Sequence, residues 1–125
     1  MDKNSFNKNV LVTGGAGYIG SHACKALSEA GYTPIAVDNL STGWSDAVKF
    51  GPLEKVDLLD PVKLYQVFEE YQPHAVMHFA AFSQVGESVI NPTKYWRNNV
   101  IGSLNLFEAC AIYGCDKVFF SSTCA

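Results

Sequence analysis

Residues 10–20 read VLVTGGAGYIG, and this stretch decides the fold. It joins an apolar run typical of a buried strand to a glycine-rich turn and the start of a helix. Gly15, Gly17 and Gly20 match the spacing G-x-G-x-x-G, while Gly14, Gly17 and Gly20 match G-x-x-G-x-x-G equally well. Glycines let a backbone turn tightly and approach a phosphate, and the following helix offers unpaired N–H groups in its first turn. The stretch therefore predicts a binding site for the pyrophosphate of a dinucleotide.

The residues after the glycines fit this interpretation. A helix is expected up to Gly31, where a glycine commonly ends a helix. A second apolar strand over 33–38 then ends on Asp38. An acid about 20 residues beyond the glycines is placed to accept hydrogen bonds from ribose hydroxyls. The apolar stripe of the helix is predicted to consist of Ile19, Ala23, Ala26, Leu27 and Ala30.

Asp38 also bears on the choice of cofactor. Its carboxylate would repel a 2′-phosphate, and neither lysine nor arginine occurs between Lys25 and Lys49 to neutralise one. NAD is therefore favoured over NADP. The alternative is that Asp38 only caps the turn after its strand, as aspartate often does.

The composition limits the class of protein. The chain has 125 residues, of which 48% are hydrophobic and 17% charged, enough for one domain with a core. Its net charge of −3 argues against a nucleic-acid partner, and no apolar run reaches the roughly 18 residues that suggest a membrane span. The amino terminus is polar without a signal peptide, and the four cysteines are not spaced for a metal site. We expect a cytoplasmic protein without a metal or a membrane partner.

Strand-like and helix-like segments alternate along the chain, which predicts an α/β fold with a doubly wound parallel sheet of the Rossmann type. About five strands are expected in the order 3-2-1-4-5, with the ligand crevice at the carboxyl ends of the first and fourth strands. Residues 1–125 would form one dinucleotide-binding domain, cut short after the fifth strand. The strands are predicted at 9–13, 33–38, 53–57, 74–80 and 117–121, with further helices at 60–71 and 92–113.

Helix 92–113 is apolar on more than one face. The second apolar face would either pack within the fold or form a subunit contact. Together with an open sheet edge at strand 117–121, it predicts self-association, as a homodimer or by edge pairing. The core-facing stripe is predicted to consist of Val100, Leu104, Phe107 and Ala111.

Polar segments elsewhere are expected at the same crevice. The turn formers of residues 38–43 would close over the adenosine half of the cofactor. Asp57, after the third strand, would accept a hydrogen bond from the adenine amino group, unless it is only a solvated turn residue. The Ala80-Ala81 pair lets the backbone pass close to a ligand, whereas His78 is expected to be a hydrogen-bonded core residue.

Two further groups are weighed against plainer alternatives. Asn98 and Asn99 lower the helix propensity of their segment, which indicates that at least one of them hydrogen-bonds a fixed partner. The alternative is that both are solvated residues on the surface of the helix. Residues 121–123, SST, would face the crevice, where a hydroxyl would bind a substrate oxygen. A plain polar exit from the strand is the alternative there.

These segments together resemble the extended short-chain dehydrogenase/reductase family, and within it the UDP-glucose 4-epimerase branch. Residues 13–20, TGGAGYIG, are similar to the family's T-G-G-x-G-x-I-G turn. Residues 38–43, DNLSTG, and residues 85–88, VGES, resemble segments typical of the epimerases and narrow the resemblance to that branch. The resemblance runs from about residue 9 to the end of the chain.

The resemblance implies a tightly held NAD that takes a hydride from C4 of a UDP-hexose and returns it to the other face, while a tyrosine removes the hydroxyl proton. It implies that Thr123 is the catalytic hydroxyl that assists this tyrosine, and that Asn98 or Asn99 lines the cofactor crevice. The predicted cofactor-binding residues are Gly14, Gly15, Gly17, Tyr18, Ile19, Gly20, Asp38, Asn39, Ser41, Thr42, Gly43, Asp57, Leu58, Phe79, Ala80, Ala81, Asn98 and Ser121.

The chain departs from the family pattern in two places. Ser83 stands where some members carry a lysine near the cofactor phosphates. The catalytic Tyr-x-x-x-Lys pair, expected on a further helix after Thr123, is missing, so the chain alone is predicted to be inactive. Tyr113 and Lys117 have that spacing, but they precede the hydroxyl cluster and would not share a helical face. Other hypotheses are a different sugar-nucleotide oxidoreductase, such as a dehydratase or uronate epimerase, and a non-catalytic NAD-binding module.

Overall fold

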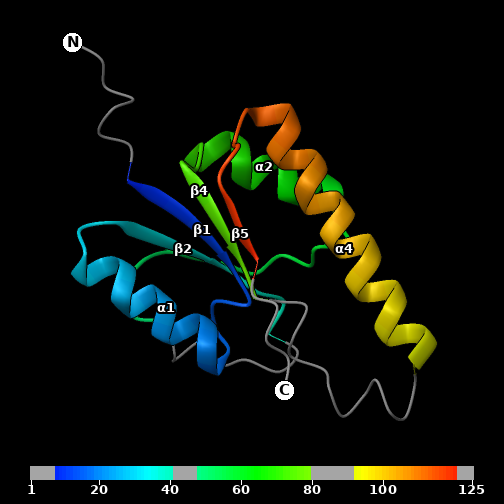
Figure 1. The fold of residues 1–125 in the computed structure, drawn as a ribbon, viewed down its shortest axis with the longest axis horizontal. Helices are drawn as coiled ribbons and strands as arrows, with labels where there is room; N and C mark the ends of the chain where they lie inside the picture. Colours follow the sequence, from blue (N-terminus) through cyan, green and yellow to red (C-terminus); the bar gives the residue numbers. More distant parts are fainter. Residues whose placement is uncertain (1–7, 41–47, 80–91, 121–125) are drawn as a thin grey trace.

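This computed structural model describes residues 8–40, 48–79 and 92–120, with only the backbone of residue 92 and of residues 94–99. Five parallel strands form one sheet in the order β3-β2-β1-β4-β5, which confirms the predicted topology (Figure 1). The strands are β1 (Asn9–Thr13), β2 (Thr33–Val37), β3 (Leu53–Glu54), β4 (Ala75–His78) and β5 (Val118–Phe120). The helices are α1 (Tyr18–Glu29), α2 (Pro61–Tyr71) and α4 (Pro92–Tyr113).

Alternate residues of β1 divide the core between the two faces of the sheet. Leu11 belongs to a buried cluster that includes Leu106 of α4 and residues of α2. Val10 and Val12 belong to a second cluster, which includes Cys24 of α1. A strand that is covered on both faces needs a continuous apolar run, and this is why β1 reads VLV at its centre. The sheet thus lies between α1 on one side and the α2–α4 pair on the other.

The central strands end at the same level. Thr13 of β1 pairs with Val37 of β2 and with His78 of β4 in the parallel ladders. The residues that follow these three, Gly14 and Asp38 among them, therefore leave the sheet at one edge. Helix α1 begins at this edge, next to the end of β1 (Figure 1).

Strand β3 is shorter than the predicted strand 53–57. It contains only Leu53 and Glu54, which pair with the last two residues of β2. The backbone then enters a turn in which the N–H of Asp60 donates to the carbonyl of Asp57 at 2.8 Å. This local hydrogen bond competes with continuation of the ladder, so Asp57 lies in a turn and not at the end of a strand. The Asp60 carboxylate caps α2 by accepting the N–H of Lys63 at 3.3 Å, as the Asp-Pro pair predicts.

The predicted stripe of α1 is wrong at three of its five positions. Ile19 is 54% exposed, and Ala26 and Ala30 are also exposed. The buried residues of the helix are Gly20 and Cys24, with Leu27 packed against their cluster. Residues 20, 24 and 27 also share one helical face, and that face is selected because glycine at position 20 allows the helix to approach the turn before it. Burial makes Cys24 a small hydrophobe and raises the pKa of its thiol to about 11.

The predicted stripe of α4 is also wrong. Val100, Leu104, Phe107 and Ala111 are all exposed. The face that packs against α2 instead carries smaller side chains around one leucine. It consists of Gly102, Leu106, Ala109 and Cys110. Both faces have helical period, so periodicity alone did not separate them; the small residues mark the face where two helices approach closely.

Among residues 8–40, 48–79 and 92–120, no helix is both long and apolar enough to cross a membrane. In the same ranges, no group of three histidine, cysteine, aspartate or glutamate residues is arranged to hold a metal ion.

Candidate functional site

The turn after β1 is held in place by backbone hydrogen bonds. Gly14 has a φ of 69°, a left-handed conformation that favours glycine. Its N–H donates to the carbonyl of Val37 at 2.8 Å, and its own carbonyl accepts the N–H of Gly17 at 3.0 Å. Helix α1 begins at Tyr18, directly after Gly17. The positive φ at Gly14 explains the first glycine of the G-x-x-G-x-x-G spacing.

Two other glycines are required for close packing of the turn. A Cβ on Gly15 would lie 2.5 Å from the Cβ of Ala36 on β2. A Cβ on Gly20 would lie 2.7 Å from the carbonyl carbon of Gly14, and closer still to its oxygen. Both distances are shorter than real Cβ contacts. Gly15 therefore lets the turn lie against β2, and Gly20 lets α1 lie against the turn.

The start of α1 provides donors for an anion. The first N–H groups of a helix have no acceptor within the helix and carry the positive end of its dipole. At this end Gly17 has no side chain, while Tyr18 and Ile19 are 79% and 54% exposed. The Tyr18 ring lies 4.5 Å from the His22 ring, measured between centroids. The turn and the first turn of α1 thus present backbone N–H groups beside exposed side chains.

Asp38 connects the glycine turn to the next loop. Its Oδ2 accepts the N–H of Ala16 at 3.0 Å, and its Oδ1 accepts the N–H of Leu40 at 2.8 Å. The second bond supports the positive φ of 64° at Leu40, which a leucine rarely adopts. Asp38 therefore does cap the turn after its strand. A carboxylate has about four lone-pair sites, so both oxygens keep capacity to accept hydroxyl groups as well.

Asp57 and Leu58 lie in the connection between β3 and α2. Asp57 is exposed and its Oδ1 accepts the N–H of Leu59 at 2.9 Å, which fits the alternative that it is a solvated turn residue. Leu58 is half-buried, and its carbonyl accepts the side-chain amide of Asn105 at 2.7 Å. Asn105 thereby fixes this turn to α4.

A buried polar chain links β1, β4 and α4. Thr13 Oγ1 lies 2.6 Å from His78 Nδ1, and His78 Nε2 lies 2.9 Å from Ser103 Oγ. Thr13 and His78 are 0% and 1% exposed. The N–H of Phe79 donates to Thr13 Oγ1 at 2.9 Å. His78 is therefore a hydrogen-bonded core histidine as predicted, and burial lowers its pKa to about 4.

This buried histidine predicts a pH-dependent stability. The pKa of His78 falls from 6.5 to about 4 on folding, so the unfolded chain binds a proton first as the pH decreases. Its contribution to stability is complete above pH 6.5 and is lost towards pH 4. Between pH 7 and pH 5 the free energy of unfolding should fall by about 2 kcal/mol from this group. Urea titrations measure the decrease.

The variants for this measurement are His78→Gln and His22→Gln. His78→Gln should flatten the decrease, whereas His22→Gln, on the exposed surface of α1, should retain it. An equal decrease in both variants would show that His78 is not its source.

Comparison with known proteins places this geometry in a family. Residues 10–125 match the sequence profile of the NAD dependent epimerase/dehydratase family. The chain belongs to this family. It is 51% identical over 119 residues to a UDP-glucose 4-epimerase of Rhizobium meliloti. The match covers 95% of this chain and 36% of that protein, so the chain spans about a third of the length of such relatives.

Solved structures agree with this assignment to the epimerase/dehydratase family. A UDP-glucose 4-epimerase from Brucella ovis in complex with NAD superposes with a TM-score of 0.88 at 51% identity, covering 94% of this chain and 36% of that one. The UDP-glucose 4-epimerase of Thermotoga maritima with UDP-glucose gives 0.87 at 41% identity, covering 92% and 38%. The resemblance inferred from the sequence motifs is thus confirmed.

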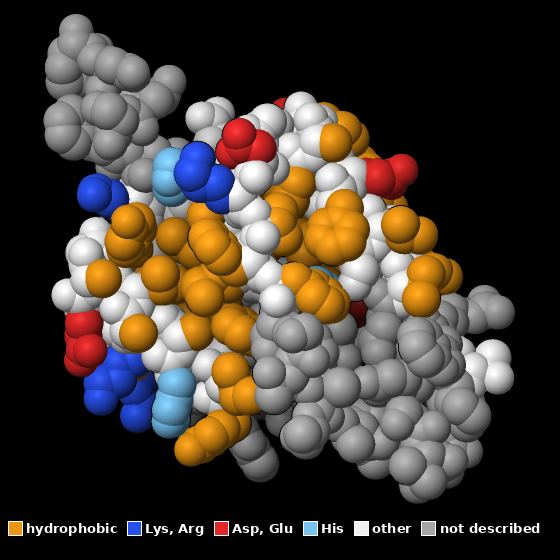
Figure 2. Space-filling view, in the orientation of Figure 1, with side chains coloured by type: hydrophobic (Ala, Val, Ile, Leu, Met, Phe, Trp, Pro, Cys, Tyr) orange, Lys and Arg blue, Asp and Glu red, His pale blue; other side chains and the backbone are white. Residues whose placement is uncertain are grey.

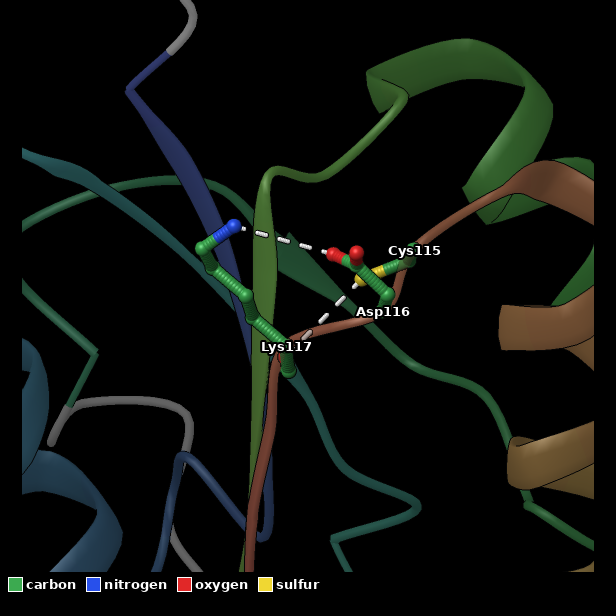
Figure 3. A network of polar contacts seen from close by, with 3 residues as sticks. All are labelled: Cys115, Asp116 and Lys117. Carbon is green, nitrogen blue, oxygen red and sulfur yellow. Dashed lines mark hydrogen bonds and ion pairs between the residues drawn. The ribbon is translucent and has the colours of Figure 1, made fainter.

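Tyr113 and Lys117 do not form the Tyr-x-x-x-Lys pair of this family, as predicted. Tyr113 is the last residue of α4, and its ring stacks on Phe68 with centroids 5.9 Å apart. Gly114, with a φ of 74°, then reverses the chain. Figure 3 shows Lys117 directed towards Asp116, with its Nζ 3.7 Å from Oδ1. The lysine therefore lies beyond the helix and pairs with a neighbouring carboxylate.

Some predicted site residues of this epimerase/dehydratase domain lie outside the described residues. Asn98 is in α4 by its backbone, and its side chain is not described. Asn39 and Phe79 lie at the carboxyl edge of the sheet, exposed and half-buried respectively. Outside the described ranges are Ser41, Thr42, Gly43, Ala80, Ala81, Ser83, Ser121 and Thr123.

Three polar residues of the epimerase/dehydratase domain were not predicted as parts of the site. Thr13 and Ser103 bind the ring of His78, and Asn105 binds Leu58. A signal for the first existed: Thr13 and His78 are each the last residue of an apolar strand, where a buried polar side chain needs a partner. Ser103 and Asn105 gave no such signal, because a polar residue on a helix is ordinarily solvated.

Proposed function

We propose that this chain is the NAD-binding part of a UDP-glucose 4-epimerase. The hydrogen bond from the N–H of Ala16 to Asp38 is the observation that carries the proposal. It joins the glycine turn to a carboxylate at the end of the neighbouring strand, which is the pair of groups that the pyrophosphate and ribose of a dinucleotide require. NAD fits this site, because the first turn of α1 offers N–H donors and Asp38 offers acceptors.

Each part of the site has a proposed ligand. The glycine turn and the first turn of α1 would hold the pyrophosphate, and Asp38 would accept the hydroxyls of the adenosine ribose. Asp57 and the Leu58 turn would border the adenine. NAD, when bound, supplies a reversible hydride acceptor. Thr123 would hydrogen-bond the reacting oxygen of a UDP-hexose, and the Tyr18, Ile19 and Phe79 side chains would border the cofactor.

The proposed reaction belongs to the whole protein. The chain spans 36% of the length of the relative from Rhizobium meliloti. Tyr113 is the last residue of α4 and Lys117 lies beyond the helix, so this pair cannot act as a tyrosine base with a lysine beside it on one helical face. Loss of such a general base costs on the order of 10²–10⁴-fold in rate. We therefore expect the chain alone to bind NAD without converting sugars.

Two measurements test the proposal. Calorimetric titration of the 125-residue chain with NAD⁺ and with NADH should show one binding site. If neither cofactor gave a binding heat, the proposal would be overturned. The whole protein should convert UDP-galactose to UDP-glucose in a panel of UDP- and dTDP-sugars. Turnover of other sugar nucleotides only would favour a dehydratase or uronate epimerase, and binding without any turnover would favour a non-catalytic module.

The apolar surface supports self-association. In the view of Figure 2, hydrophobic side chains gather over the middle of the molecule and charged side chains lie at its margins. The exposures of single residues identify a separate apolar surface on α4. On α4 the exposed apolar residues include Leu104 at 56% and Phe107 at 42%, and Phe120 of β5 is 51% exposed. Apolar patches of this kind mark contact surfaces. We propose that the α4 face joins two copies of the chain, and that its buried free thiols fit a reducing cytoplasm.

A charged residue on the exposed apolar face of α4 should dissociate the proposed dimer. Leu104→Asp places a carboxylate where an apolar contact is proposed, and burying it unpaired costs several kcal/mol. The expected result in light scattering is a shift from dimer to monomer, with the fold retained because Leu104 is exposed. The control is Glu29→Gln, an exposed position on α1, on the other side of the sheet. A wild-type chain that stays monomeric at high concentration would contradict the proposal.

A further inference from the structure

Thr13, His78 and Ser103 form a chain of hydrogen bonds, called here the His78 chain, which joins β1, β4 and α4. Its hydroxyl–imidazole distances are 2.6 Å and 2.9 Å, and both ring nitrogens of His78 are used. The ring cannot rotate without losing both bonds. Aromatic contacts restrain it further, because Phe107 of α4 and Phe120 of β5 have ring centroids 6.3 Å and 5.3 Å from it.

At its Thr13 end, the His78 chain fixes the course of the backbone after β1 and after β4. Thr13 is the last residue before Gly14, so its side chain sets where the glycine turn starts. The N–H of Phe79 donates both to Thr13 Oγ1 at 2.9 Å and to the Thr13 carbonyl at 3.1 Å. One threonine thereby fixes the departure of the backbone after β1 and after β4.

At its Ser103 end, the His78 chain fixes the position of α4 against the sheet. Ser103 lies in α4, about one helical turn after Asn98 and Asn99. A hydrogen bond from the sheet to Ser103 sets how far α4 slides and rotates against β4. Neighbouring Gly102 faces the side chain of Leu58, so it does not itself fix α4 against β4.

We propose that His78 is a positioning residue for the cofactor site: it holds the glycine turn and the amino-terminal half of α4 at a fixed separation. This inference rests on the proposed binding of NAD. The ring takes no part in proton transfer. It acts through Thr13 on the turn and through Ser103 on the helix, so damage at either end should weaken cofactor binding although neither hydroxyl is proposed to touch the cofactor.

The test measures NADH affinity of the 125-residue chain by fluorescence titration. Thr13→Val and Ser103→Ala each remove one hydroxyl with little change of shape, and each should weaken binding about tenfold, the effect of one buried hydrogen bond. Thr13→Ser restores the hydroxyl and should bind within about twofold of wild type. The double variant Thr13→Val/Ser103→Ala should lose much less than the product of the single losses, because both act through one ring.

The control separates positioning from stability. Asn9→Ala removes the hydrogen bond from Asn9 Nδ2 to the carbonyl of Tyr71, at 2.7 Å, on the same strand as Thr13 but at its other end. It should lower the urea midpoint and leave NADH affinity unchanged. If Thr13→Val and Ser103→Ala also lower only the midpoint, His78 is merely structural and the inference fails. If wild type itself does not bind NADH, the proposed function fails instead, so the two failures are distinguishable.

Discussion

Gly20→Ala should destabilise the chain by about 3 kcal/mol and weaken NAD binding at least a hundredfold, the size of effect seen when a close-packed site is overfilled. An alanine inside a helix ordinarily gains about 1 kcal/mol over glycine. Here the new Cβ would lie 2.7 Å from the Gly14 carbonyl carbon and 2.9 Å from Gly15 Cα. These atoms belong to the backbone of the turn, so the turn and α1 must separate, and the donors proposed to hold the pyrophosphate no longer converge.

Gly102→Ala is the matched control for this variant. Gly102 also lies within a helix, but its added Cβ would meet only the side chain of Leu58, at 3.2 Å, and a side chain can shift. Urea unfolding should place Gly102→Ala within about 1 kcal/mol of wild type. Calorimetry with NAD⁺ then compares affinity in the two variants. A Gly20→Ala chain as stable and as tightly binding as wild type would show that the close approach of α1 to the turn is not required.

The parallel sheet and the place of the glycine turn were predictable because each rests on patterns in the local sequence. The apolar run before residue 14 and the glycines after it specify a strand and a tight turn without reference to the rest of the chain. Asp38 was predicted for the same reason, since a strand end and an acid are adjacent in sequence. The structure adds that its carboxylate already binds the turn through Ala16, a contact between residues 22 positions apart.

The faces of the helices were not predictable from periodicity. On α4, Val100 and Leu104 have the same spacing as Gly102 and Leu106, and only the second pair is buried. The choice depends on the partner: Leu106 packs in one cluster with buried residues of α2, and Gly102 faces the side chain of Leu58. The same applies to Ser103, whose partner His78 lies 25 residues earlier on β4. Contacts between side chains of different elements cannot be predicted until the relative positions of those elements are known.

The choice between NAD and NADP should depend on Asp38. A 2′-phosphate bound to the ribose would face this carboxylate, and like charges placed together cost several kcal/mol. Wild type should therefore bind NAD at least a hundredfold more tightly than NADP. Asp38→Ala should reduce that ratio to within about tenfold, because the repulsion is gone while NAD also loses its acceptor. Both affinities are measured by calorimetry on the same preparation.

The ratio is more informative than either affinity, since Asp38 also supports the turn. Its carboxylate accepts the N–H groups of Ala16 and Leu40, so Asp38→Ala must loosen the site for any dinucleotide. Such damage weakens NAD and NADP alike and cancels in the ratio, whereas the lost repulsion affects NADP alone and the lost acceptor of the 2′-hydroxyl affects NAD alone. Asp57→Ala provides the control: it should weaken both cofactors and leave the ratio unchanged, because its proposed contact is with the adenine they share. An unchanged ratio in Asp38→Ala would mean that Asp38 only caps its turn and that another group selects the cofactor.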